Sequence, residues 1–448
     1  MTEIPRSPIV RSAKFASLPL GYAARLALGV GQRAVGQAAH TVSADLQQHT
    51  AERLFSVLGE LKGGAMKLAQ ALSVFEAALP ERLMPPYRAT LTRLQDSAPS
   101  LPVATVHKVM RAELGPRWQR DFRDFDDAPA AAASIGQVHR AVWRDGRQVA
   151  VKVQYPGIRE AMAADLDQLG RVAGLFRVLQ PKFRLRPVIA ELRSRLTEEL
   201  DYEFEAQAQR GFAAAYTGDD EIAVPGVVAA TGRVLVTDWF SGTPLSAIIA
   251  GGDQTERDRA GYLLATLHFS APARAGLLHA DPHPGNFRML ADGRLGVLDF
   301  GAVARLPGGL PADLGRLLRA TLDRDAEAVH RLLRTTGFLE AGSGVSVGAA
   351  LDYLVPAMAP LERDDFRFSR SWLRQEVARV THPHRPGYRV SRRLQLPPAY
   401  LLIHRVTLGS IGMLCQLEAH ADYRNVVDSW LPGFGCHGSS GQRSLRVA

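Results

Sequence analysis

The stretch HADPHPGN at residues 279–286 decides the fold, because it places Asp281 five positions before Asn286. A carboxylate beside an acceptor can orient an attacking hydroxyl or water, and an amide oxygen can bind a metal ion that bridges phosphates. Both groups on one short loop are typical of phosphoryl transfer rather than of an ordinary polar turn. We therefore predict that Asp281 is catalytic and that Asn286 is a metal ligand.

A second metal ligand is expected one hairpin later, and the sequence LDFG supplies it with Asp299. This aspartate ends a predicted strand, and the glycine two residues later lets the backbone turn sharply. Two short strands, expected over residues 286–290 and 295–298, flank an Asp-Gly turn. A D-x-x-x-x-N loop, a hairpin and a DFG within 21 residues follow the order seen in protein kinases. This order predicts Mg²⁺ held by Asn286 and Asp299.

The same loop also allows a metallohydrolase, with His279, Asp281 and His283 as metal ligands. Such sites usually need further clusters of His or Asp, and the nearest candidates, His382 and His384, lie in a predicted loop. We prefer the kinase interpretation. In it His279 braces the catalytic loop, and His283 has no assigned role.

Upstream, the sequence VAVKV at residues 149–153 is a predicted strand that carries Lys152, one of only six lysines in the chain. It resembles the V-A-I-K strand in which a lysine holds the α- and β-phosphates. A strand with one outward-facing lysine is common, so the residue alone proves little. Its place after a predicted hairpin and before the metal-binding loop gives Lys152 its predicted role at the phosphates.

Kinases cover the phosphates with a G-x-G-x-x-G loop before this strand, and the chain has none. The sequence AAAASIGQV at residues 130–138 stands in its place. Methyl groups restrict left-handed backbone conformations, but backbone amides can still face a phosphate. An alanine run is most often a helical turn. Here we predict a nucleotide-covering loop made by Ala131, Ala132, Ala133 and Ser134.

A helix expected over residues 188–216 carries more acidic groups than a solvated face requires, and one of them could orient Lys152. The candidates are Glu198, Glu199, Asp201, Glu203 and Glu205. Spacing alone does not choose among them.

The order of elements predicts an α+β chain with a divergent, two-lobed kinase-like fold. We divide it into a helical N-terminal extension (residues 1–100), an N-lobe (residues 101–240) and a helical C-lobe (residues 241–448). The strands expected over residues 138–143 and 148–153 are joined by Asp-Gly. Helices are expected over residues 103–114, 158–179 and 256–270, the last ended by Pro272.

Everything beyond residue 311 is predicted to be helical, apart from a loop over residues 381–396. Residues 399–417 are the closest approach to a membrane span, but His404 and Arg405 near their middle favour a buried helix.

A net charge of +9 and a pI near 9.8 favour anionic partners such as phosphates or an acidic membrane surface. We find no nucleic-acid-binding pattern and predict no nucleic-acid partner. Two cysteines cannot form a disulfide framework, which favours a reducing, cytoplasmic setting. The basic N-terminal helices suit packing on the main domain or peripheral contact with an anionic membrane, and a transit peptide is a further alternative.

Over roughly residues 50–420 the chain resembles the UbiB/aarF-type atypical kinases. The resemblance is carried by PAAAASIGQVHRA (residues 129–141), VAVKVQYPG (149–157), EELDYEFEA (198–206), HADPHPGN and LDFG. It implies that Glu205 is the partner of Lys152. It also implies that Glu199 and Asp201 form the family's E-x-D pair at the nucleotide pocket.

The resemblance further implies that Lys67 and Gln70 belong to the family's K-x-G-Q element, which folds over the active site. Ala69 stands where the family has glycine, and its methyl group restricts the close backbone approach at that position.

The family resemblance implies ATP (or ADP) and Mg²⁺ as cofactors, ATPase activity, and a link to isoprenoid-quinone biosynthesis and lipid handling. The partners it implies are the nucleotide and components of a quinone or lipid pathway. Two alternatives stay open: a small-molecule phosphotransferase of the aminoglycoside/choline-kinase type, and a nucleotide-gated pseudokinase scaffold.

Overall fold

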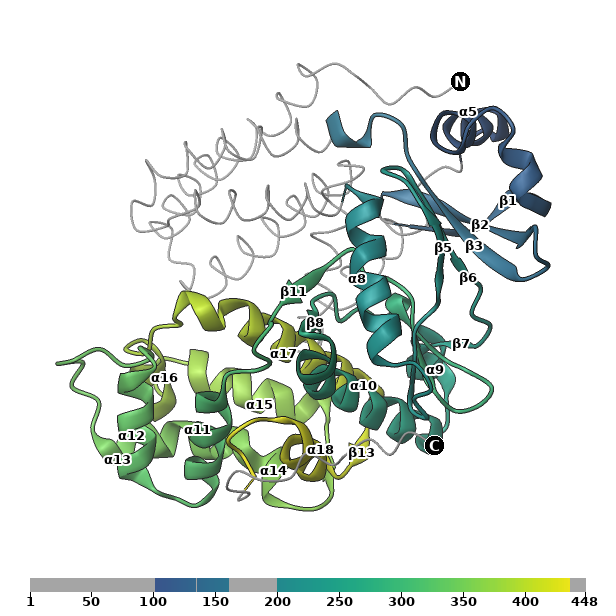
Figure 1. Cartoon of the computed structure of the whole chain (residues 1–448). Coiled ribbons are helices and arrows are strands. Elements are labelled where there is room, and N and C mark those ends of the chain that lie inside the picture. Colours follow the sequence, from purple (N-terminus) through teal and green to yellow (C-terminus); the bar gives the residue numbers. More distant parts are fainter. Residues whose placement is uncertain (1–100, 134, 161–199, 436–448) are drawn as a thin grey trace, which may run out of the picture. The chain divides into compact units, whose positions relative to one another are not determined.

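The computed structural model of the chain describes residues 101–435, apart from Ser134 and residues 161–199 (Figure 1). The described residues fall into two compact units. The first unit comprises residues 101–160, 200–204 and 228–238, and the second comprises residues 205–227 and 239–435. The predicted helical extension lies outside the described residues, and the domain boundaries at residues 100 and 240 stay predictions.

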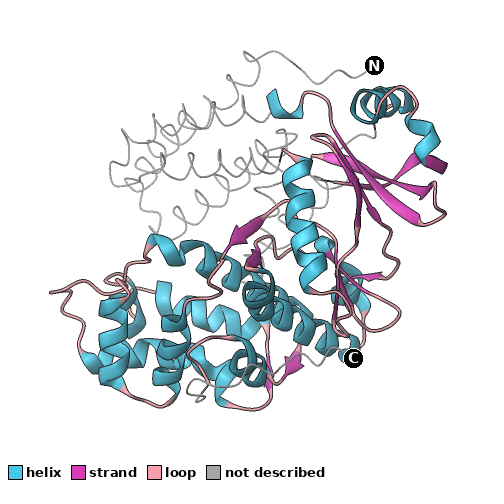
Figure 2. Ribbon diagram, in the orientation of Figure 1, coloured by secondary structure: helices cyan, strands magenta, loops and turns pink. Residues whose placement is uncertain are grey.

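The first unit is built on a five-stranded sheet in the order β1-β2-β3-β6-β5 (Figure 2). Its strands are β1 (Phe122–Ala132), β2 (Gly136–Trp143), β3 (Gln148–Gln154), β5 (Val227–Ala230) and β6 (Val234–Asp238). Helix α5 (Val103–Leu114) and the 3₁₀ turn η3 (Trp118–Asp121) precede the sheet. The predicted helix over residues 103–114 and the two predicted strands of the hairpin are therefore confirmed.

Alternation along β3 separates its two faces. Val149, Val151 and Val153 are fully buried in the core of the first unit, together with side chains of α5 and Trp118. Because side chains alternate in direction along a strand, Lys152 points to the face opposite this core. The β2–β3 turn contains Gly146, whose positive φ of 97° explains why glycine follows Asp145 there.

The alanine run is not the loop that the sequence predicts. Ala131 and Ala132 lie in β1, opposite Val138 and Gln137 of β2, and the strand ends at Ala132. The turn is closed by a 2.8 Å hydrogen bond from the Ala133 N–H to the Gly136 carbonyl. Alanine has a poor strand propensity, but a partner strand that accepts its backbone hydrogen bonds overrides that preference.

The second unit contains three small sheets. The first has the order β4-β10-β9-β7, with β4 (Ile222–Ala223), β7 (Thr243–Pro244), β9 (Phe287–Met289) and β10 (Leu295–Val297). The other two pair β8 (Leu277–His279) with β11 (Val303–Arg305) and β12 (Phe366–Arg367) with β13 (His420–Ala421). The β9–β10 hairpin confirms the predicted strand–turn–strand. The β12–β13 pair corrects the prediction that everything beyond residue 311 is helical.

Helices make up most of the second unit (Figures 1 and 2). They are α9 (Leu245–Gly251), α10 (Gln254–Ala275), η4 (Pro284–Asn286), α11 (Ala312–Leu322), α12 (Ala326–Thr335), α13 (Val347–Leu354), η5 (Val355–Met358), α14 (Ala359–Glu362), α15 (Arg370–Thr381), α16 (Pro386–Ser391), α17 (Pro398–Leu417) and α18 (Tyr423–Trp430). Helix α8 (Tyr202–Ala215) begins in the first unit and continues into the second.

The predicted end of one helix and one predicted loop are wrong. Pro272 lies inside the last turn of α10, and the helix ends three residues later, where Gly276 adopts a left-handed φ of 62°. A proline removes one helical hydrogen bond, which the surrounding packing of α10 offsets. The predicted loop over residues 381–396 contains the short helix α16, which Pro386 begins because a fixed φ suits a first helical turn.

Helix α17 is the only helix in the described ranges that is long and apolar enough to cross a membrane, judged by length and composition. Ile403, Val406 and residues 412–415 are buried, and α10 is its main packing partner. Leu401 (55% exposed) and Leu408 (38% exposed) lie on its outer side. The predicted buried helix is therefore buried on one side only.

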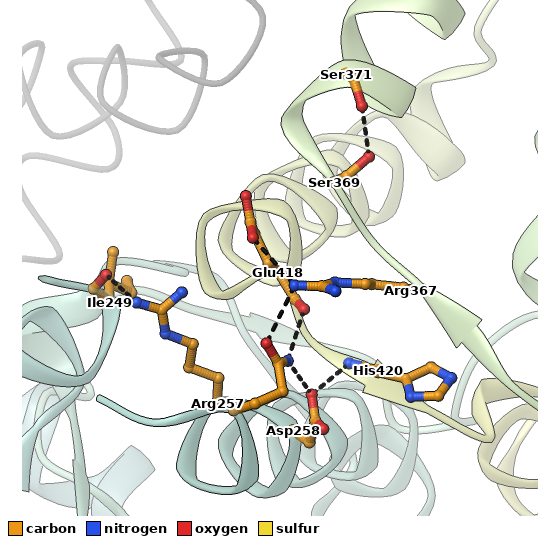
Figure 3. A network of polar contacts seen from close by, with 9 residues as sticks. Ile249, Arg257, Asp258, Arg367, Ser369, Ser371, Glu418 and His420 are labelled. Carbon is orange, nitrogen blue, oxygen red and sulfur yellow. Dashed lines mark hydrogen bonds and ion pairs between the residues drawn. The ribbon is translucent and has the colours of Figure 1, made fainter. Parts of the chain in front are cut away.

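A polar network fastens the end of α17 to the start of α10 (Figure 3). Asp258 Oδ1 accepts hydrogen bonds from the Gln254 side chain (2.6 Å) and from the His420 backbone N–H (2.7 Å). Arg367 donates to the Gln254 side chain (3.1 Å) and to the Glu418 carboxylate (3.2 Å). These bonds hold the residues that follow α17 against the start of α10.

Inside the same helix pair, His268 of α10 is buried. Its ring nitrogens lie 3.1 Å from Thr407 Oγ1 and 3.3 Å from Ser410 Oγ, both on α17. Burial lowers the pKa of His268 from 6.5 to about 4, because a charged imidazole would be desolvated there.

This pKa predicts acid sensitivity. The unfolded chain takes up a proton near pH 6.5 that folded His268 refuses until about pH 4, so the free energy of unfolding should fall as the pH drops through that range. The loss attributable to His268 is about 3 kcal/mol at most. Urea unfolding between pH 7 and 4 measures it. His268→Gln should flatten part of the slope, whereas the exposed control His382→Gln should not; equal slopes in both variants would contradict the assignment.

Candidate nucleotide and magnesium site

Asp281 and Asn286 are brought together by the loop that follows β8. The Ala280 N–H donates to the Ala302 carbonyl (2.9 Å), which extends the β8–β11 pairing up to the loop. The Asn286 side-chain nitrogen donates to Asp281 twice, to its backbone oxygen (3.1 Å) and to carboxylate Oδ2 (3.0 Å). Asn286 is buried, so these bonds fix its orientation.

The loop between the two residues is held by its own backbone. The His283 N–H donates to the Asp281 carbonyl (2.8 Å), and the Asn286 N–H donates to the His283 carbonyl (3.0 Å). The His283 ring accepts the Gly285 N–H at Nδ1 (3.1 Å) and so begins the η4 turn. This gives His283, which sequence analysis left unassigned, a structural role.

Asp299 is fastened to the same loop. The Leu298 N–H donates to the Asn286 carbonyl (2.9 Å), which joins the end of β10 to the catalytic loop. His279 Nε2 donates to the Asp299 carbonyl (2.6 Å). Asp299 Oδ1 accepts the Gly301 N–H (2.9 Å), which turns the chain after the strand. The three predicted phosphate-handling residues of this unit therefore share one hydrogen-bonded frame.

A cluster of aromatic side chains packs next to this frame. The Phe300 ring is fully buried, 5.0 Å from the Phe212 ring of α8 and 5.8 Å from His279. The His279 ring also lies 5.3 Å from Phe287. His279 is thus a bracing residue, as the sequence suggested.

The metallohydrolase interpretation fits the structure poorly. His279 Nε2 and His283 Nδ1 are both committed to backbone groups, as described above. Within residues 101–435, as far as they are described, no group of three or more His, Cys, Asp or Glu side chains could hold a metal ion.

The kinase-like interpretation needs a different donor set, a carboxylate with an amide oxygen. The nitrogen of the Asn286 amide donates to Asp281, so its oxygen is the atom left for a cation. Asp299 supplies a carboxylate on the same frame. Hard oxygen donors of this kind suit Mg²⁺, and the residues present therefore fit the ion.

In the first unit, Lys152 lies in the middle of the sheet, between Val138 of β2 and Leu235 of β6. Its Nζ stands 5.0 Å from the centre of the Tyr202 ring, within the range of a cation–π interaction. Sequence analysis did not single out Tyr202. The available signal was an aromatic residue within the acidic run at residues 198–205.

Gly136 begins β2 beside this lysine, and a larger residue would not fit there. An added Cβ would lie 2.3 Å from the Val153 carbonyl oxygen and 2.9 Å from the Tyr202 hydroxyl. Only glycine therefore fits where β2 begins beside β3. Ala131 and Ala132 are exposed in β1, Ala133 begins the turn, and Ser134 lies outside the described residues.

The acidic candidates have separate places. Asp201 stands before α8, and its carboxylate accepts the Glu203 N–H (3.0 Å), the geometry of a helix cap. Glu205 is 2% exposed. A carboxylate so buried needs a cation or several hydrogen bonds, which suits its predicted role as the partner of a lysine. Glu199, Lys67 and Gln70 lie outside the described residues, and all these roles stay predictions.

The signature of the ABC1 atypical kinase-like domain matches residues 93–333, more than half of the 448 residues. The chain belongs to this family. The UbiB/aarF resemblance and the kinase-like α+β fold are thereby confirmed.

Relatives within the family differ in length. The chain is 31% identical to the "Atypical kinase coq-8, mitochondrial" of Caenorhabditis elegans over 75% of its own residues, but it spans only 46% of that protein. It is 30% identical to the "Atypical kinase COQ8B, mitochondrial" of Rattus norvegicus, with 95% of this chain and 80% of that protein covered.

A solved structure is matched over nearly the whole of its own length. It is the complex of Rv3197 with erythromycin from Mycobacterium tuberculosis, 43% identical, with a TM-score of 0.70. The match covers 89% of this chain and 99% of that one. This solved structure is thus similar to the chain in extent as well as in fold.

Proposed function

We propose that this chain is a magnesium-dependent, ATP-binding phosphotransferase or ATPase that supports isoprenoid-quinone or lipid metabolism. The observation that carries the proposal is the single frame that holds Asp281, Asn286 and Asp299. A carboxylate and an amide oxygen for a magnesium ion, with a second carboxylate for the acceptor, are the groups that phosphoryl transfer uses.

Each residue then has a chemical role. Asn286 and Asp299 hold the magnesium ion, which, when bound, offsets the charge of the phosphates. Asp281 orients the attacking hydroxyl or water. Lys152 neutralises the α- and β-phosphates, and Glu205 orients Lys152.

The hairpin supplies the remaining contacts to the nucleotide. Ala131, Ala132, Ala133 and Ser134 lie next to the phosphates of ATP or ADP. Glu199 and Asp201 flank the pocket, as the family resemblance implies. Lys67 and Gln70 close it on the acceptor side, which excludes large peptide acceptors.

The second ligand is a large apolar or amphipathic molecule. A relative that is 43% identical over nearly its whole length was solved with erythromycin, a bulky and largely apolar macrocycle. A quinone, a lipid and a macrolide share that character. A soluble amino alcohol or sugar, the substrate type of the alternative phosphotransferases, does not.

We further propose a cytoplasmic protein that contacts an anionic membrane peripherally. Between Glu376 and Glu418 the chain carries six arginines and no acidic residue. This stretch includes the exposed Arg389 and Arg392 near α16 and the exposed Leu401 on α17. Cations beside exposed leucines are the pattern of surfaces that lie on anionic lipid.

Magnesium nucleotide should raise the melting temperature of the protein. At a concentration about 100-fold above Kd the gain in stability is about 2.7 kcal/mol. Asp299→Asn should remove the magnesium-dependent part of the shift, because an amide is a poorer ligand for Mg²⁺ than a carboxylate. The exposed control Asp364→Asn should keep it. A full magnesium-dependent shift in Asp299→Asn refutes the metal assignment.

Phosphate release measures turnover and identifies the second ligand. We expect wild-type release to rise with anionic vesicles or with erythromycin, but not with neutral vesicles, choline or an aminoglycoside. Asp281→Asn should bind nucleotide and release no phosphate above background, because it cannot orient the acceptor. Stimulation by choline or an aminoglycoside would favour the soluble-acceptor alternative. No release under any condition would favour the pseudokinase.

The vesicle arm of this assay also tests the surface. The double variant Arg389→Glu, Arg392→Glu should lose the stimulation by anionic vesicles and keep basal release. The control Arg117→Glu, Arg120→Glu makes the same charge change on exposed residues of the first unit. Equal stimulation of both double variants would show that α16 is not the membrane contact.

A further inference from the structure

Helix α8 buries an amide side chain in the core of the second unit. Gln209 is fully buried, and its Nε2 donates to the Pro225 carbonyl oxygen at 2.7 Å. Among the described residues, no group bonds to its Oε1. Leaving a buried acceptor unpaired is unfavourable, so an apolar side chain of the same length would suit this core position better. The bond to Pro225 is therefore the feature of Gln209 that calls for an explanation.

This bond ties α8 to the strand that leads to Asp299. Pro225 lies two residues after β4, and β4 pairs in parallel with β10. The Leu295 N–H adds a backbone hydrogen bond to the Glu221 carbonyl (2.8 Å), which extends this pairing. Strand β10 ends at Val297, two residues before Asp299. The buried amide therefore links α8 to the predicted magnesium ligand through one pair of strands.

Two further contacts hold α8 in the same place. Almost one turn further along the helix, the Phe212 ring lies 5.0 Å from the ring of Phe300, which follows Asp299 directly. Just beyond the end of the helix, the hydroxyls of Tyr216 and Ser270 share a buried hydrogen bond of 2.7 Å, and Ser270 belongs to α10. The aromatic contact and the two side-chain hydrogen bonds together fix α8 relative to Asp299.

Glu205 lies on the face of α8 that Gln209 anchors. The two residues are four positions apart, which places them side by side on a helix, and both are buried. In the proposed function Glu205 orients Lys152. A buried carboxylate can orient a cation only where its own position is fixed, because a small shift of the helix would carry it away from its partner. The anchor at Gln209 meets this requirement one turn from Glu205.

We propose that Gln209 is a positioning residue, which fixes Glu205 relative to Asp299 by anchoring α8 to the Pro225 carbonyl. The inference rests on the proposed function, in which both carboxylates serve the same magnesium nucleotide. Gln209 touches neither the nucleotide nor the metal ion and acts only through Glu205. Its loss should therefore weaken nucleotide binding only while Glu205 is present.

The test is a double-mutant cycle with Gln209→Met and Glu205→Gln. Titration with a non-hydrolysable ATP analogue and Mg²⁺ should show that Gln209→Met binds up to about tenfold more weakly than wild type, the most expected for one lost hydrogen bond. In the Glu205→Gln background, which itself binds more weakly, Gln209→Met should cause no further loss. The matched control Gln207→Met makes the same change at an exposed position of the same helix and should bind the analogue normally.

Melting temperatures separate positioning from a simple loss of packing. Gln209→Met exchanges one unpaired buried acceptor, its own Oε1, for another, the Pro225 carbonyl oxygen. The melting temperature without nucleotide should therefore stay within about 4 °C of wild type. Weaker binding that persists at full size in the Glu205→Gln background would indicate general loosening of the second unit and would overturn the inference.

The outcomes also separate the inference from the proposed function. Wild-type protein that binds no magnesium nucleotide, or Glu205→Gln that binds it as tightly as wild type, overturns both. If Glu205→Gln binds weakly while Gln209→Met binds normally, only the inference fails. If Gln209→Met does not fold, Gln209→Asn takes its place in the cycle, since its amide is one methylene shorter and falls short of Pro225.

Discussion

The hydrogen bond from the Asn286 amide to the Asp281 carboxylate is the interaction on which the proposed magnesium site of the second unit depends. It places an acid and an amide oxygen side by side on a loop of only six residues. The backbone bond between Leu298 and Asn286 then brings Asp299 to the same place. Without these two links the three groups would be independent polar side chains, and a metal ion would have no preorganised ligands.

The rest of this unit keeps that frame rigid. Phe300 and His279 pack in an apolar cluster with Phe212, so the DFG segment is anchored through its phenylalanine while its aspartate stays at the surface of the core. The long helix α10, capped at Asp253, packs on α17 and on β8, the strand that leads into the loop. The positions of Asp281, Asn286 and Asp299 are therefore maintained by buried neighbouring residues that are not themselves reactive.

Sequence reasoning succeeded where a residue type is dictated by local chemistry. The Asp-Gly turns, the helix over residues 103–114 and the hairpin before Asp299 follow from backbone preferences that act over a few residues. Prediction from the sequence failed where contacts with residues distant in the sequence determine the local structure. Ala131 and Ala132 form a strand because β2 pairs with them, and Pro272 stays helical because α10 is packed on several sides. The buried pair of Gln137 and His139 could not be predicted either, because its partners Leu101 and Asp126 are far from it in sequence.

The central proposal is that Lys152 and Asp299 bind the phosphates and the magnesium ion of one nucleotide. Isothermal titration with a non-hydrolysable ATP analogue and Mg²⁺ tests it directly, using Lys152→Ala, Asp299→Asn and the double variant. We expect each single variant to bind the analogue more weakly than wild type does. The two losses of binding free energy should not be additive, because both groups act on one ligand. If Lys152→Ala bound the analogue with wild-type affinity, the result would contradict this proposal.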